Sequence, residues 1–453
     1  MIEILEVLAG YFDILTDLGA SVMLPIVIFI LGLIFGQKIG KAFHSGLLIG
    51  VGFVGINLIL DLLVENLGPA AESMVERFGV ELAIVDVGWP ASAAIAFGSE
   101  VGALIIPLAL AVNVVMILLK LTKTLNVDLW NYWHFAFTGA LVARLTDSLV
   151  WGLVAAGVNA AIVLVLADWT APIVQDFYDL PNISIPHGFS AAFVPIAIPI
   201  NKLLDRIPVI KDLDADPEAV QDKLGVFGQP VILGLILGLI LGVLAGYDSQ
   251  EILDLGITMA AVMLLFPRMV KILMEGLTPL SEAAKAFMKK KFEDREIYIG
   301  LDSAVAIGHP SAISTALILV PITIGLAIIL PGNAVLPFGD LASLPFLVVM
   351  IIPITEGNIL RSTIIGTMIM AVGLYIATGL AELHTAAARA AGFEFPEGVA
   401  TLSSIIDGAN PLTWILVRAT GLGGWAILLL GAITLILGYY VFRNFSARED
   451  LQR

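Results

Sequence analysis

The stretch Ile299-Gly-Leu-Asp-Ser-Ala-Val-Ala-Ile-Gly-His-Pro310 sets an aspartate and a histidine between two long apolar runs. Its glycines and proline oppose a continuous helix. A carboxylate at the centre of a membrane helix costs about 2.5–3.5 kcal/mol, so an aspartate kept at that depth usually faces a cavity or a partner group. We interpret the stretch as a buried site. The alternative is a short loop at the membrane surface that holds Asp302 and His309.

The composition of the chain is that of a polytopic membrane protein. Hydrophobic residues make up 59% of the 453 residues, charged residues make up 14%, and the mean hydropathy is +0.98. Soluble domains carry about 25% charged residues. The apolar runs are continuous rather than alternating, which favours membrane helices over barrel strands. We predict an all-α polytopic membrane protein with ten or eleven transmembrane helices.

Positive charge is unevenly distributed along the chain. Of the 23 lysines and arginines, 18 lie in five segments: 38–41, 120–123, 202–223, 268–295 and 443–453. Because lysine and arginine gather on the cytoplasmic side of membrane helices, we predict that these segments and the C-terminus are cytoplasmic. Residues 267–297 form an amphipathic, lysine-rich segment, which is typical of a helix lying on the cytoplasmic membrane surface.

Several function classes are disfavoured by what the sequence lacks. The chain has no cysteine, which excludes disulfides, thiolate metal sites and a cysteine nucleophile. Its net charge of −16 argues against nucleic acid as a partner. It contains no P-loop, His-Glu-x-x-His or Gly-x-Ser-x-Gly motif, so it has no nucleotide or hydrolase machinery of its own. We expect no cofactor and no metal.

A second interrupted segment, residues 84–100, contains Asp86, Trp89 and Pro90. It is too short and too broken to cross a membrane as one helix, so we predict a re-entrant hairpin, a form tolerated where it lines a cavity or is buried in protein. Each broken segment follows a run of glycines spaced four apart: Gly32, Gly36 and Gly40 before the first, and Gly234, Gly238, Gly242 and Gly246 before the second. Corresponding broken segments in two halves indicate an inverted-repeat transporter with its binding site between the halves; the alternative is a chance recurrence.

Eight motifs occur in order over nearly the whole chain: Val85-Asp-Val-Gly-Trp-Pro90, Val127-Asp-Leu-Trp-Asn-Tyr-Trp-His134, Ile185-Pro-His-Gly188, Ala245-Gly-Tyr-Asp248, Ala260-Ala-Val-Met-Leu-Leu265, Gly276-Leu-Thr-Pro279, Ile299-Gly-Leu-Asp302 and Val335-Leu-Pro-Phe-Gly-Asp-Leu341. Together they closely resemble the galactitol-type IIC component, or permease, of the bacterial phosphoenolpyruvate-dependent sugar phosphotransferase system. A more distant resemblance, around residues 184–187 and Asp302, reaches the ascorbate IIC transporter.

This resemblance implies a homodimeric, multi-pass permease of the bacterial cytoplasmic (inner) membrane. In each protomer, a core with two re-entrant hairpins would move in an elevator-like way against a dimerisation part. A phosphocysteine on a cytosolic IIB protein, charged through IIA, would phosphorylate the sugar alcohol, in keeping with the missing cysteine. The core is expected to include residues 84–118, 183–200 and 299–330, and the dimerisation part residues 20–63 and 229–266.

The ascorbate resemblance implies that His187 and Asp302 contact the substrate and assist phosphoryl transfer, and it places His134 and Asp86 near the same pocket. Polyol hydroxyls donate and accept hydrogen bonds, which suits a pocket of carboxylates and imidazoles with an aromatic wall such as Trp89. Asp302 is the first candidate for the group that takes the hydroxyl proton, and His187 is the second.

Simpler interpretations of the histidines remain open. His187 could cap a helix end beside Pro186, and His134 could be an interfacial histidine among aromatics. His309 would share the face of Asp302, and hence a substrate-binding role, only if the intervening helix were regular.

Two other functions remain open. In an ion- or proton-coupled secondary transporter, Asp86 and Asp302 would be coupling carboxylates, and the solute would leave unmodified. An intramembrane enzyme is disfavoured because the chain lacks metal-ligand spacing and a nucleophile motif.

Overall fold

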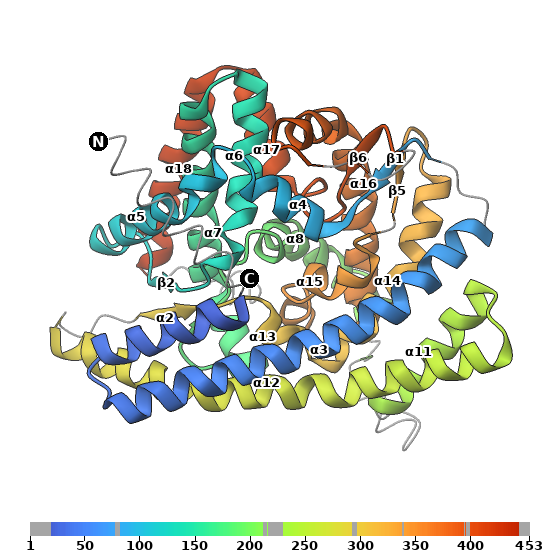
Figure 1. Cartoon of the computed structure of the whole chain (residues 1–453), viewed down its shortest axis with the longest axis horizontal. Coiled ribbons are helices and arrows are strands. Elements are labelled where there is room, and N and C mark those ends of the chain that lie inside the picture. The colour runs from blue at the N-terminus through green and yellow to red at the C-terminus, as the bar shows by residue number, and fades with distance from the viewer. Residues whose placement is uncertain are drawn as a thin grey trace.

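The computed structural model describes residues 20–77, 82–211, 215, 230–291, 297–337, 339–393, 395 and 399–443. It is mostly helical (Figure 1). The elements in chain order are α2 (Ala20–Ile34), α3 (Ile39–Arg77), β1 (Ile84–Asp86), α4 (Gly88–Phe97), η1 (Gly102–Leu104), α5 (Ile105–Leu118), β2 (Thr124–Asn126), η2 (Trp130–Tyr132), α6 (Trp133–Thr146), α7 (Leu149–Tyr178), β3 (Ile183–Ser184), η3 (Ser190–Phe193), α8 (Val194–Leu204), α9 (Pro208–Lys211), α11 (Pro230–Ala245), α12 (Ser249–Lys291), β4 (Tyr298–Gly300), α13 (Ala304–Ile307), α14 (Pro310–Ile329), β5 (Val335–Leu336), η5 (Leu341–Ser343), α15 (Leu344–Val348), η6 (Pro353–Thr355), α16 (Ile359–Ala390), β6 (Thr401–Ser403), α17 (Pro411–Gly421) and α18 (Gly424–Phe442).

Membrane-capable helices are present, as the composition predicts. Within the described residues, α7, α14, α16 and α18 are long and apolar enough to cross a membrane. A fifth span results if the helices Ala91–Phe97 and Gly102–Leu118, which are bent by 72° at the break between them, count as one. That bend falls where residues 84–100 were predicted to be broken. The ten or eleven crossings predicted from the apolar runs go beyond these five, and that number stays a prediction.

Four helices, α2, α3, α11 and α12, pack against one another as one layer, with α3 and α12 side by side along the lower edge of Figure 1. The glycine spacing explains the close contact between α11 and α12. A Cβ added at Gly234 or Gly238 of α11 would lie 2.7 Å from a backbone carbonyl oxygen of α12, that of Met259 or Leu255. Small residues on one helix face therefore let the two backbones approach closely.

Two of these helices are longer than the hydropathy pattern predicts. The apolar run 47–63 and the acidic stretch that follows it lie on one continuous helix, because α3 extends to Arg77. Similarly, α12 runs from Ser249 through the segment predicted to lie on the membrane surface, as far as Lys291. Charged residues do not end a helix when they can occupy an exposed stripe, as the exposed acids of α3 do. Residues 212–214, 216–223, 229, 292–296 and 444–453 of the predicted segments lie outside the described residues.

The sequence did not predict two short parallel sheets. The first has the strand order β5-β1-β6 and the second β2-β4-β3. In the first, Ile84 pairs with Val335 and Thr401. In the second, Ile299 pairs with Leu125 and Ile183. The central strands β1 and β4 thus lead directly into the two broken segments, and the ladders satisfy backbone N–H and C=O groups where the helix is interrupted.

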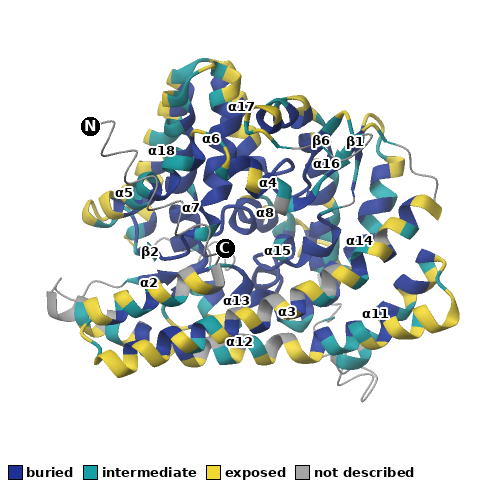
Figure 2. Ribbon diagram, in the orientation of Figure 1, coloured by how far each residue is buried: buried dark blue, intermediate teal, exposed yellow. Residues whose placement is uncertain are grey.

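Burial follows the arrangement of the layers. Figure 2 shows the buried residues gathered around α6, α8, α13 and α15, while the outer helices carry exposed side chains. Many exposed side chains are large and apolar, such as Leu58 of α3, Ile257 of α12, and Leu428 and Ile436 of α18. This distribution is the one that a lipid-facing surface requires.

Candidate functional site

Two imidazoles and a carboxylate from three separate segments meet in the core. His134 lies in the first turn of α6, His187 in the loop between β3 and η3, and Asp302 directly after β4. The Nε2 atom of His187 is 3.4 Å from Nε2 of His134 and 3.7 Å from Oδ1 of Asp302. Of the six residues predicted to contact substrate, these three are brought together.

The second sheet explains why these residues meet. Its strands β2, β4 and β3 are parallel, so their carboxyl ends lie at the same edge. The chain leaves β4 into Asp302 and leaves β3 into the loop of His187, while β2 is followed by Asp128 and Asn131. The carboxyl edge of a parallel sheet commonly forms a ligand site, because the side chains of several loops converge there.

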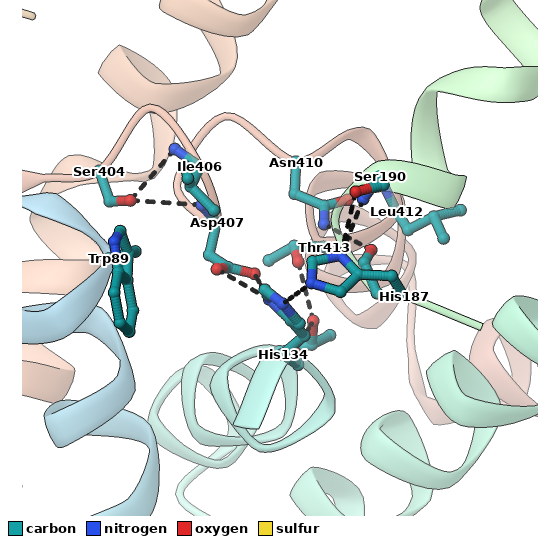
Figure 3. Close-up of polar contacts among 12 residues, drawn as sticks. Trp89, His134, His187, Ser190, Ser404, Ile406, Asp407, Asn410, Leu412 and Thr413 are labelled. Carbon is teal, nitrogen blue, oxygen red and sulfur yellow. Dashed lines mark hydrogen bonds and ion pairs between the residues drawn. The ribbon is translucent and has the colours of Figure 1, made fainter. Parts of the chain in front are cut away.

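The hydrogen-bond partners assign the tautomer of each neutral imidazole. The backbone N–H of Ser190 can only donate, and it donates to Nδ1 of His187 over 3.2 Å. The proton of neutral His187 is therefore on Nε2. Nδ1 of His134 lies 3.0 Å from both carboxylate oxygens of Asp407, so it carries the proton and donates it. Nε2 of His134 is then a lone pair that faces the Nε2–H of His187 (Figure 3).

Asp302 is the most accessible member of this cluster. Its side chain is 13% exposed, compared with 4% for His187 and 2% for His134. Oδ1 of Asp302 accepts the backbone N–H of Ala304 at 2.9 Å. The Asn131 amide interacts with the Asp302 carboxylate and also donates to Asp128 over 2.7 Å. Backbone and amide donors therefore hold Asp302 in place, while a small part of its side chain stays accessible.

Asp407 belongs to this cluster, although the sequence reasoning missed it. Asp407 is fully buried, in the loop between β6 and α17. Its neighbourhood, Ser403-Ser-Ile-Ile-Asp-Gly-Ala-Asn-Pro411, carries the same helix-breaking signal of glycine and proline beside an aspartate that singled out Asp302. Asp128 and Asn131 were also missed as site residues, although both lie in one of the quoted motifs.

Asp86 lies in a separate polar cluster at the carboxyl edge of the first sheet. Its carboxylate accepts backbone N–H groups, among them those of Asp340 (2.9 Å) and Ile405 (3.3 Å). The Asp340 carboxylate accepts the N–H of Trp89 and the hydroxyl of Ser404, both at 2.6 Å. Both aspartates are fully buried. Together they tie β1 to the loops that follow β5 and β6, which include the loop of Asp407.

The other two predicted residues lie farther from the imidazoles. The ring of Trp89 is 6.4 Å from that of Trp133, which in turn is 4.0 Å from His134. Trp89 is thus one ring removed from the site. His309 caps α14, because its Nδ1 accepts the N–H of Ser311 at 3.2 Å, and its ring packs on aromatics at the end of α7. The structure does not bring His309 to Asp302.

A metal site is not apparent in the part of the chain that the structure describes, where no group of three or more His, Asp or Glu residues is placed to hold an ion. The cluster instead combines hydrogen-bond donors and acceptors. Asn131 and the Nε2–H of His187 can donate, whereas Asp302 and Nε2 of His134 can accept. Such a set suits a neutral ligand rich in hydroxyl groups.

Comparison with known proteins shows the family of the chain. Residues 13–398 match the family described as the PTS system sugar-specific permease component. The chain belongs to this permease family. It is 43% identical over 402 residues to the PTS system galactitol-specific EIIC component of Escherichia coli K12, covering 89% of each chain. It is 41% identical over 412 residues to a putative permease IIC component of the same organism, covering 91% of this chain and 94% of the relative.

The comparisons confirm the resemblance seen in the sequence motifs. In this permease, the family match ends at residue 398. His134, His187 and Asp302 lie inside it, and Asp407 lies beyond it. The loop that carries Asp407 is nevertheless joined to the rest of the site, because the Asn410 amide donates to the carbonyl oxygen of Gly188 over 3.0 Å (Figure 3). The polar cluster is therefore completed by the C-terminal part of the chain.

Proposed function

We propose that this permease carries galactitol across the bacterial cytoplasmic membrane, and that a IIB phosphocysteine phosphorylates the sugar on the cytoplasmic side. The observation that carries the proposal is the 43% identity, over 89% of both chains, to a galactitol-specific EIIC component. The buried cluster of His134, His187 and Asp302 supports it, since hydroxyl groups need donors and acceptors together. The family membership disfavours the alternative of an ion- or proton-coupled transporter.

Hydrogen bonds and exposure support separate roles for Asp302 and His187 in phosphoryl transfer. We assign Asp302 to accept the proton of the terminal hydroxyl as its oxygen attacks phosphorus; the new O–P bond forms, the P–S bond breaks, and the IIB thiolate leaves. Asp302 is the more exposed of the two. His187 carries its proton on Nε2 and so donates to a substrate oxygen rather than accepting a proton there.

The transport mechanism belongs to the same proposal. The layer of α2, α3, α11 and α12 would form the dimerisation part of a homodimer, which is supported by its mutual packing and its exposed apolar side chains. The core, with re-entrant hairpins at the two broken segments, would move against this layer, and the C-terminus would be cytoplasmic. Because the chain has no cysteine, a single Arg443→Cys variant tests the orientation: an impermeant maleimide should label it in inside-out vesicles only.

Uptake of radiolabelled galactitol tests the proposed function directly. Vesicles containing the permease are supplied with phosphoenolpyruvate and the cytosolic phosphotransferase proteins, and free and phosphorylated label are separated afterwards. We expect phosphorylated galactitol to form only with phosphoenolpyruvate, and to fall at least about hundredfold in Asp302→Asn. The matched control is Asp254→Asn, a neutralised aspartate on the exposed surface of α12. Unmodified sugar accumulated by an ion gradient would contradict the proposal.

A further inference from the structure

The two imidazoles of the site present opposite hydrogen-bonding atoms to the same point. Nε2 of His187 carries a proton, because Nδ1 accepts the Ser190 N–H. In the neutral ring of His134, Nε2 carries a lone pair, because the one proton is on Nδ1 and is donated to Asp407. The two Nε2 atoms are 3.4 Å apart. A hydroxyl group is both donor and acceptor, so it can accept from one of these nitrogens and donate to the other.

Asp407 determines which ring nitrogen of neutral His134 carries the proton. The described hydrogen bonds of the His134 ring are those to Asp407 and His187, and His187 is itself held as a donor. A carboxylate only accepts, so it excludes the tautomer of His134 that carries its proton on Nε2. In that excluded tautomer the two Nε2–H groups would face each other over 3.4 Å, and neither could accept a hydroxyl proton.

The Asp407 loop is rigidly held, as a positioning role requires. The backbone N–H of Asp407 donates to the hydroxyl oxygen of Ser404 at 3.3 Å, and the N–H of Asn410 donates to the carbonyl of Asp407 at 3.2 Å. One turn into α17, the Thr413 hydroxyl is 2.8 Å from the Thr138 hydroxyl of α6 (Figure 3). The carboxylate and the helix that carries His134 are therefore fastened to each other.

We propose that Asp407 is a positioning residue that fixes the His134 tautomer, so that His134 and His187 form an acceptor–donor pair reading one hydroxyl group of the substrate. This inference rests on the proposed function for its choice of probe, galactitol. It assigns a specificity role to a residue outside the matched family region and goes beyond the roles given to Asp302 and His187.

Equilibrium binding to the purified, full-length permease tests the inference. Galactitol is compared with the monodeoxygalactitols, each of which lacks one hydroxyl. For wild type, we expect one analogue to bind about a hundredfold more weakly than galactitol, because the analogue that lacks the bound hydroxyl makes neither of the two hydrogen bonds to these nitrogens. In Asp407→Asn, we expect galactitol to bind about tenfold more weakly and the penalty for that analogue to fall below about fivefold, since the amide can also donate and the tautomer is no longer fixed.

Two controls separate this role from general stability. Asp168→Asn neutralises another buried aspartate, which accepts from the Thr124 hydroxyl at 2.7 Å, and it should leave the analogue penalty unchanged even where it lowers thermal stability. In a His134→Gln background, Asp407→Asn should change galactitol affinity less than about twofold, because Asp407 acts through His134.

Each outcome has a distinct meaning. An unchanged analogue penalty in Asp407→Asn, or a full additive loss in the His134→Gln background, would overturn the positioning role and leave the proposed function intact. Failure of wild type to bind galactitol would overturn the proposed function and this inference with it. If Asp407→Asn does not fold, the test uses the affinity penalty for the same deoxy analogue in His134→Gln. That penalty should also fall below about fivefold, and a retained hundredfold penalty would refute binding of one hydroxyl by both histidines.

Discussion

Gly188 controls the distance between the two imidazoles, so Gly188→Ala is the most direct perturbation of the site. An added Cβ would lie 2.6 Å from Cβ and 3.1 Å from Cγ of His134. Ordinary contact begins at 3.4 Å, so the His187 loop and α6 must separate by roughly 0.8 Å. Gly188 does not have a positive φ, so alanine fits the backbone and the effect is steric alone.

The expected consequence is a loss of function larger than the loss of stability. Overpacking of this kind costs about 1–3 kcal/mol of unfolding free energy. The Nε2 atoms of His134 and His187, now 3.4 Å apart, would separate to roughly 4.2 Å and lose their direct contact, so both rings would leave the positions from which they meet a ligand. Displacement of a positioned group by about 1 Å typically lowers rate about hundredfold, and we expect galactitol phosphorylation to fall between about tenfold and hundredfold.

The assay pairs thermal unfolding in detergent with the vesicle phosphorylation measurement. The matched control is Gly157→Ala in α7, where an added Cβ would meet Val112 at 3.7 Å, an ordinary contact. The Gly157→Ala variant should keep wild-type activity, and its unfolding free energy should rise by up to about 1 kcal/mol, because alanine favours the helix. If Gly188→Ala retains activity within about twofold while remaining folded, the close approach of the imidazoles is not needed and the reasoning is refuted.

Three further predictions follow from other contacts. Asp86→Ala should lower the unfolding free energy by at least about 2 kcal/mol, because three backbone N–H groups lose their acceptor. Thermal unfolding checks this against the exposed control Asp254→Ala, and equal melting temperatures for the two variants would contradict it. His309→Asn should keep the cap of α14 and leave galactitol affinity within about twofold. A tenfold loss of affinity in equilibrium binding would support its predicted substrate role instead. His187→Gln should lower galactitol phosphorylation at least about tenfold while exposed His44→Gln leaves it unchanged, and equal activities would remove His187 from the mechanism.

Much of the site could be predicted because polar residues are rare in this chain. An aspartate beside glycine and proline inside an apolar run indicates a broken, buried segment, and this signal led to Asp86 and Asp302. The same signal surrounds Asp407 and was overlooked there. His309 satisfies it as well, yet the structure uses that histidine as a helix cap. The pattern therefore predicts where a side chain is buried, but not whether it faces a ligand or the backbone.

The short sheets could not be predicted from alternation along the chain. Their strands have two or three residues, too few to display a period of two, and each is paired with segments far away in the sequence, as Ile84 is with Val335 and Thr401. The continuity of α3 and α12 across changes in hydropathy was not predicted, for a related reason. Hydropathy marks a change of environment along a helix, and the helix itself continues as long as its backbone bonds can form.

Composition and ordered motifs identify this protein as a membrane permease of the sugar phosphotransferase type, because both are properties of the chain alone. Which polar residues act together depends on the fold. His134, His187, Asp302 and Asp407 come from four separate segments, and parallel strand pairing together with loop hydrogen bonds brings them into contact. Hydrogen bonds act over about 3 Å, so their pairing depends on positions in space that sequence separation does not encode.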